Sequence, residues 1–112
     1  MTNEDDLYAN QVLELRRGTI VLAVFSELKK PRYGYELLQR LKEIDMAIDA
    51  GTLYPQLRRF EKQGILTSYW DTSEARPRKY YQLSKQGVKL YKHLKDEWVT
   101  ISNKITYMIQ GE

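Results

Sequence analysis

The sequence predicts a mainly helical α+β fold, because three helical segments precede two short strand-forming segments and one long final helix. The connection between the second and third helices is short, and the loop between the strands carries several cations. This order of elements is that of a winged helix-turn-helix, in which the third helix enters the DNA major groove and the strands form a wing. We therefore predict a winged helix-turn-helix with one long C-terminal dimerisation helix.

The length of 112 residues suits one domain and is too short for two independent cores. We expect residues 1–83, the DNA-binding part with its N-terminal helix, and residues 84–112, the dimerisation helix, to form one compact unit. The chain has no cysteine, which excludes disulfides and zinc sites of the Cys type. The acidic, polar start over residues 1–10 and the lack of a long apolar stretch predict a cytoplasmic protein without a membrane partner.

The first predicted helix spans residues 8–28, with apolar positions on one face and an apolar run over residues 20–25. Pro31 then ends it, since proline cannot continue a helix and restricts the residue before it. The second predicted helix runs from Tyr33 to about Ile44, with its leucines at helical spacing. These two helices provide the apolar faces on which a third helix can pack.

The third predicted helix runs from Thr52 to Gln63. Thr52 as N-cap places Pro55 at the third helical position, where its missing amide costs little. A start at Asp49 would instead require a kink at the proline. Gly64 is predicted to be a left-handed C-cap that closes the helix in a Schellman motif.

The strand-forming segments 66–70 and 79–83 predict a hairpin with a long polar loop. Ser84 then caps a final helix that extends to about Ile109, much longer than the domain itself requires. Apolar residues recur along it in alternating steps of three and four, a heptad seam that predicts pairing with a second copy. The predicted dimerisation residues are Tyr91, Leu94, Trp98, Ile101, Ile105 and Met108.

Positive charge is concentrated in the second half of the chain. Between Arg58 and Lys95 there are ten Lys or Arg residues against three acids, a local net charge of +7, so the total of +3 leaves −4 elsewhere. Such asymmetry indicates a polyanionic partner, here double-stranded DNA. The candidate DNA contacts lie on the second and third helices and on the wing: Tyr35, Thr52, Tyr54, Gln56, Arg58, Arg59, Lys62, Arg76, Arg78 and Lys79.

Each of these residues also has a purely structural interpretation. Arg58 and Arg59 suit a solvated helix face, with one of them paired to an acid such as Glu61 or Glu36. Tyr54 lies at the flank of the apolar stripe and could belong half to the core. Tyr35, like the tyrosine two positions before it, could instead join the second helix to the first.

Three runs carry a family resemblance: YGYEL at residues 33–37, GTLYPQLRRFEKQGIL at residues 51–66, and RKYYQLS at residues 78–84 followed by Gly87. They resemble the PadR family of transcriptional regulators over about residues 8–108. The resemblance implies a dimeric repressor with a winged DNA-binding domain, acting on a roughly palindromic operator. The single long terminal helix is similar to the short subfamily.

Some members of that subfamily are multidrug sensors, in which a tryptophan of each terminal helix lines a pore at the dimer interface and stacks flat aromatic ligands. Trp98 occupies a matching place, so the resemblance implies a flat aromatic or cationic ligand there. Asp96 and Glu97 could attract a cationic ligand, and Val12 and Leu15 could supply apolar contacts. A tryptophan in such a seam is more often only a dimer anchor, in which case the protein would be a ligand-independent repressor.

Other classes of function fit the sequence less well. The only histidine, His93, lies among lysines and is expected to be exposed. There is no glycine-rich phosphate loop and no Cys/His ligand spacing, so we expect no enzyme, no cofactor and no metal site. A winged-helix protein-interaction module that does not bind DNA remains an alternative, because a fold alone does not determine function.

Overall fold

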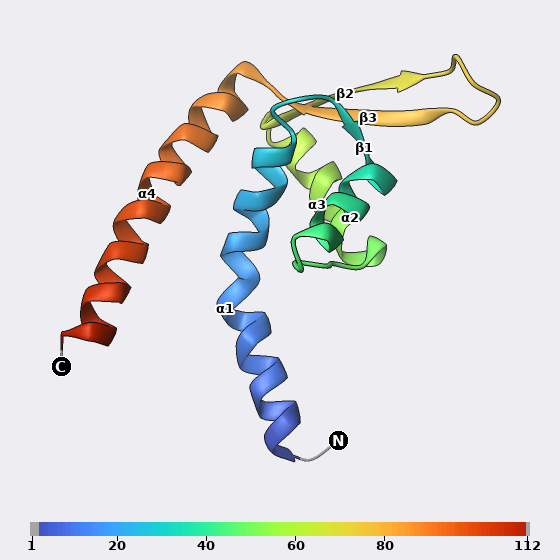
Figure 1. The fold of residues 1–112 in the computed structure, drawn as a ribbon. Helices are drawn as coiled ribbons and strands as arrows, with labels where there is room; N and C mark the ends of the chain where they lie inside the picture. Colours follow the sequence, from blue (N-terminus) through green and yellow to red (C-terminus); the bar gives the residue numbers. More distant parts are fainter. Residues whose placement is uncertain (1–2, 112) are drawn as a thin grey trace.

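The computed structural model describes residues 3–111. Residues 1, 2 and 112 lie outside the described residues. Residues 1 and 2 belong to the predicted range 1–83 and its acidic start, and residue 112 belongs to the predicted range 84–112. The elements follow the order α1 (Asn3–Glu27), β1 (Arg32–Tyr33), α2 (Gly34–Glu43), α3 (Ala50–Lys62), β2 (Leu66–Asp71), β3 (Arg78–Leu83) and α4 (Lys85–Gln110). The predicted mainly helical α+β fold of the winged-helix type is confirmed (Figure 1).

The core forms where α1, α2 and α3 meet one face of the sheet. Phe25 of α1 and Phe60 of α3 meet edge to face at its centre, with ring centroids 5.0 Å apart. The buried apolar residues come from all three helices and from both long strands: Val24, Phe25, Leu28, Leu37, Leu41, Leu53, Leu57, Phe60, Leu66, Tyr81 and Leu83. This core holds α3 and the wing in a defined mutual orientation.

The sheet contains a short strand that the sequence did not predict. Its order is β1-β3-β2, antiparallel throughout, with Tyr33 of β1 and Tyr69 of β2 both opposite Tyr80 of β3. The prediction that Tyr33 begins the second helix was wrong, since Tyr33 is extended and α2 begins at Gly34. β1 has only two residues, too few to show the alternation of apolar and polar side chains by which a strand is predicted. It is recognised as a strand because it pairs with β3.

Two of the predicted helices, the first and the third, begin earlier in the chain than expected. α1 begins at Asn3 rather than at residue 8, and its first turn carries three acids, which favour a helix N-terminus. α3 begins at Ala50, so the predicted N-cap at Thr52 was wrong. The Asp49 carbonyl accepts from the amides of Thr52 and Leu53 at 3.1 and 3.0 Å, which starts the helix there. Pro55 therefore lies inside α3.

The predicted end of α3 and the start of α4 are confirmed. Gly64 has φ of +80°, and the Ile65 amide donates to the Phe60 carbonyl at 2.9 Å, as in a Schellman motif. Ser84 is extended, and its hydroxyl accepts from the Gly87 amide at 2.9 Å, which caps α4. The hairpin is confirmed with one more residue on each strand.

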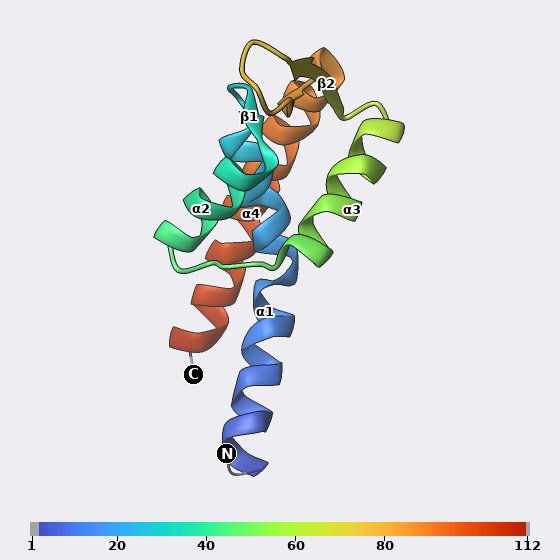
Figure 2. The ribbon, with the colours of Figure 1, turned by 90° about the vertical axis from the view of Figure 1, so that its right-hand side faces the viewer.

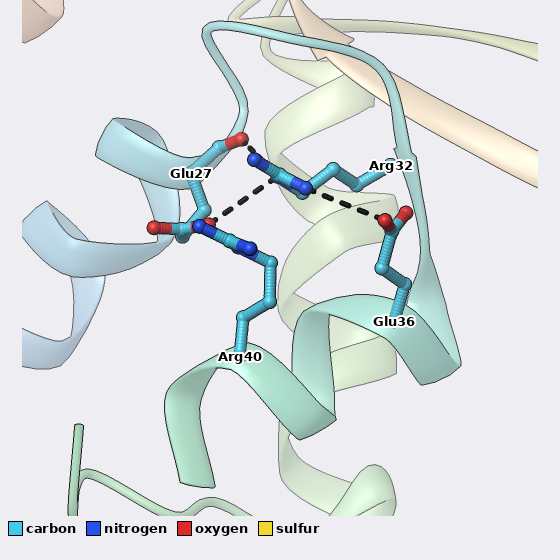
Figure 3. A network of polar contacts seen from close by, with 4 residues as sticks. All are labelled: Glu27, Arg32, Glu36 and Arg40. Atoms are coloured by element: carbon cyan, nitrogen blue, oxygen red, sulfur yellow. Dashed lines mark hydrogen bonds and ion pairs between the residues drawn. The ribbon is translucent and has the colours of Figure 1, made fainter. Parts of the chain in front are cut away.

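Ion pairs fasten α1 to the start of the helix-turn-helix (Figure 3). The Arg32 guanidinium donates to the Glu27 main-chain carbonyl at 2.8 Å, which satisfies a carbonyl at the end of α1. It also lies 3.3 Å from the carboxylate of Glu36 in α2. Arg40 of α2 pairs with the Glu27 carboxylate. The Arg32 side chain is only 16% exposed, whereas those of Glu36 and Arg40 are 36% and 41% exposed, so Arg32 is the protected member of this cluster.

The helices α1 and α4 extend away from the winged domain on the side opposite the wing, as the two views show (Figures 1 and 2). The radius of gyration is 16.6 Å, against about 13 Å for a compact domain of this length. The halves of α1 and α4 that point away from the domain therefore lack a neighbouring layer within the protomer. No helix within residues 3–111 is long and apolar enough to cross a membrane.

Candidate nucleic-acid interface

A groove of about 660 Å³ lies between α2, α3 and the wing. Its walls combine aromatic rings with cations, and none of its lining residues is acidic. The lining residues are Tyr33, Gly34, Tyr35, Tyr54, Arg58, Trp70, Arg76, Pro77, Arg78, Lys79 and Tyr81. An open groove with this lining suits a phosphate backbone that carries apolar sugars.

The structure brings together most of the predicted DNA contacts. Six of them line the groove: Tyr35, Tyr54, Arg58, Arg76, Arg78 and Lys79. Thr52, Arg59 and Lys62 lie outside the groove lining, on the exposed surface of α3. Gln56 is half-buried, and its side-chain oxygen is buried without a hydrogen-bond partner among the described residues. Gln56 is thus less accessible than the exposed predicted contacts on α3.

Tyr54 holds α2 and α3 together at the floor of the groove. Its ring is partly buried against the core, as the structural interpretation anticipated, and it also lines the groove. Gly34 begins α2 directly against this ring, because a Cβ at Gly34 would lie 2.6 Å from Cε1 of Tyr54. Tyr35, the next residue, remains 60% exposed at the rim. The start of α2 is therefore positioned beside α3 for joint contact with a ligand.

The wing cations differ in their surroundings. Arg76 is exposed, and no ion pair joins it to any residue that the structure describes. Arg78 lies over the Tyr33 ring, 4.7 Å from its centroid, and 3.6 Å from the exposed carboxylate of Glu74. Lys79 forms an ion pair with Glu61 at 3.2 Å. Arg58 and Arg59 form no such pair among residues 3–111, since Glu61 pairs with Lys79 and Glu36 with Arg32.

Sequence reasoning missed the contribution of Trp70 to the groove. Trp70 lies opposite Lys79 in the hairpin register and is 63% exposed. A tryptophan at the end of a predicted strand, next to a basic loop, was the available signal. Its ring gives the wing an apolar surface beside its cations.

A second cavity of about 810 Å³ lies between α1 and α4, away from the groove. Its lining is mainly apolar and includes Leu15, Leu22, Trp98 and Ile101, with the Glu97 carboxylate as the one ionisable group. Of the predicted ligand contacts, Leu15, Glu97 and Trp98 therefore come together. Val12 and Asp96 are exposed and do not line this cavity.

The predicted heptad seam divides into two parts. Tyr91 and Leu94 pack against the protomer's own core. The remaining seam residues are exposed, and the outer part of α1 shows further exposed apolar residues: Leu7, Tyr8, Val12, Leu13, Leu15, Trp98, Ile101, Ile105 and Met108. Exposed apolar side chains gathered on two helices in this way indicate an interaction site. His93 is exposed, as predicted.

A helix-turn-helix, a basic wing and one aromatic, cationic groove between them define a winged-helix transcriptional regulator. The chain belongs to the transcriptional regulator PadR-like family, whose pattern it matches over residues 21–93. It is similar to a crystal structure of a PadR family transcriptional regulator from Eggerthella lenta, with 38% identity, 97% of each chain covered and a TM-score of 0.91.

Two further proteins are similar to this chain. A transcriptional regulator from Clostridium thermocellum is 30% identical, with 87% of this chain and 99% of that chain covered and a TM-score of 0.76. An uncharacterized protein from Lysinibacillus sphaericus is 32% identical over 88 residues, which are 75% of this chain and 81% of the relative.

Proposed function

We propose that the protein is a homodimeric repressor that binds DNA through α3 and the wing. The observation that carries this proposal is the groove in which Tyr35, Tyr54 and Arg58 face the cations of the wing. In winged helix-turn-helix proteins the third helix enters the major groove while the wing lies on the backbone. Here Arg58 would reach phosphates or base edges beside α3, and Arg76 would contact the backbone next to it.

The second copy is proposed to pack on the outer parts of α1 and α4. Their exposed apolar residues have no partner layer within the described protomer, and burial of each such side chain contributes about 1.5–3 kcal/mol. A two-fold dimer presents two copies of α3. The operator is therefore expected to be roughly palindromic, with half-sites about one helical turn or a multiple apart.

The test of this function is the salt dependence of DNA binding by the wild-type protein. The logarithm of the binding constant is expected to fall linearly with the logarithm of salt concentration, by about 0.9 for each phosphate neutralised. Fluorescence anisotropy of a labelled duplex over a range of salt concentrations measures this slope. Binding that does not respond to salt, or no binding at all, would favour the protein-interaction module instead.

The cavity between α1 and α4 supports a second proposal, release of the repressor by a small aromatic ligand. Trp98 offers a ring for stacking, and Leu15 and Ile101 offer apolar walls. Glu97 is the ionisable group in the lining, so a flat aromatic cation suits the cavity better than an anion. The ligand would then sit next to the proposed dimer surface, where it can alter how the two copies pair.

Trp98 fluorescence is expected to report this ligand. The chain has two tryptophans, so Trp70→Phe leaves Trp98 as the only one. Flat aromatic cations should quench this variant in a saturable manner, because a stacked ligand contacts the ring directly. The matched control is Trp98→Phe, whose remaining Trp70 should not show saturable quenching. If neither variant is quenched by a broad panel, Trp98 is a dimer anchor and the repressor does not respond to such ligands.

A further inference from the structure

Lys79 differs from the exposed wing cation Arg76 in what it contacts. Its ammonium lies 3.2 Å from the Glu61 carboxylate of α3 and over the Tyr81 ring, 5.1 Å from the ring centroid. Its side chain is 28% exposed. Arg76, three positions earlier, is exposed on the loop. The two cations line one groove, but only Lys79 has a carboxylate facing it.

Glu61 joins α3 to both strands of the wing. The Ser68 hydroxyl of β2 donates to one carboxylate oxygen, and the Lys79 ammonium of β3 donates to the other. The Ser68 hydrogen bond, and then the contacts with Lys79, lower the pKa of Glu61 from its ordinary value, although burial acts in the opposite direction. The carboxylate is therefore ionised at neutral pH and holds both strands.

We propose that Glu61 is a positioning residue that links the recognition helix to the wing and keeps Lys79 from neutralising DNA phosphate. The proposal rests on the proposed DNA-binding function and departs from the sequence-based prediction that Lys79 contacts DNA. A cation already matched by a carboxylate adds no released counterion when DNA binds, unless that ion pair breaks. One side chain thus sets the spacing between α3 and the wing, and with it the spacing of their contacts along the DNA.

The first test compares Lys79→Gln with its matched control Arg76→Gln by the salt slope of DNA binding. Arg76→Gln is expected to reduce the slope by about 0.9, the value for one phosphate contact. Lys79→Gln should leave the slope within about 0.3 of wild type, a small part of one contact. A reduction in Lys79→Gln equal to that in Arg76→Gln would overturn the proposal. A wild-type slope near zero would contradict the DNA-binding function itself, so the two failures are distinguishable.

The second test removes the charge from Glu61. Glu61→Gln keeps an oxygen acceptor for Ser68 but leaves Lys79 without its carboxylate. The dependence of its DNA binding on salt is expected to become steeper by up to about 0.9, because the freed Lys79 can neutralise a phosphate. The double variant Glu61→Gln/Lys79→Gln should return to the wild-type slope. A wild-type slope in Glu61→Gln would show that Lys79 is not held back by this pair, and would overturn that part of the proposal.

The positioning role is tested by specificity. Glu61→Ala removes the contacts to both strands. The probes are a duplex that the wild-type protein selects from a random library and a scrambled duplex of the same composition, and we expect the ratio of their affinities to fall about fivefold, with most of it regained in Glu61→Gln. Thermal unfolding of each variant checks that the domain remains folded. If Glu61→Ala is folded and keeps the wild-type ratio, the link between α3 and the wing does not position the DNA contacts.

Discussion

Replacement of Arg76 and Arg78 by alanine is expected to weaken binding to operator and to unrelated DNA alike, by about tenfold to a hundredfold. Both residues line the groove on the wing side, and phosphate contacts carry little sequence information. The salt slope should become less steep by about 0.9 through the loss of Arg76. Arg78 should add up to about 0.9 more, because its ion pair with the exposed Glu74 must break before it can neutralise a phosphate. Anisotropy titrations of operator and scrambled duplexes at several salt concentrations measure both quantities.

A matched control for this double variant is Lys89→Ala/Lys92→Ala, which removes two exposed cations of α4 that do not line the groove. It has the same change in net charge, so a long-range electrostatic effect would appear in both proteins. The wing assignment is wrong if the arginine variant binds its operator as wild type does. It is also wrong if the two double variants lose affinity equally.

Removal of α4 after Lys92 is expected to abolish the dimer. The truncation deletes the exposed apolar residues of the outer part of α4 and also Leu94, which packs against the core. A monomer or an unfolded chain is therefore the expected product. Sedimentation velocity and circular dichroism distinguish these two results, and a folded dimer of the truncated chain would contradict the proposed interface.

A point variant separates loss of pairing from loss of folding. Ile101 and Ile105 are about half exposed in the protomer, at 50% and 54%, so glutamate at both positions should leave the protomer folded. Each isoleucine is already about half buried, so its further burial in the dimer contributes about half of 1.5–3 kcal/mol, and the four isoleucines of a two-fold dimer contribute about 3–6 kcal/mol. This loss corresponds to a dissociation constant raised more than a hundredfold. Asn103→Glu, on the opposite face of α4, should keep the wild-type dimer. If Ile101→Glu/Ile105→Glu remains dimeric, the subunits pair elsewhere.

The local elements were largely predictable from the chain. Gly64 and Ser84 are helix-capping residues, and capping depends only on backbone groups a few residues away. The end of α3 and the start of α4 were therefore predicted correctly. The start of α3 was not, because Thr52 and Asp49 are both good N-caps and Pro55 favoured the later start. The hydrogen bonds of the Asp49 carbonyl decide between them.

The sequence predicted most of the residues that lie at the candidate site, but not which of them are buried or paired with another side chain. The cations at Arg76, Arg78 and Lys79 look equivalent in the sequence, within four positions of one loop and strand. Only in the fold does Lys79 meet Glu61, which is 18 positions away. Gln56 likewise reads as an exposed polar residue of α3, but packing leaves it half-buried.

The sequence by itself determined the mainly helical winged fold, the bounded end of the recognition helix and the excess of positive charge around the wing. These follow from apolar periodicity, capping residues and composition, which act over a few residues. Tertiary structure alone decided that β1 pairs with β3, that α1 and α4 enclose a cavity beside Trp98, and that Lys79 pairs with Glu61. Those features depend on contacts between residues far apart in the chain, and local patterns carry no information about such contacts.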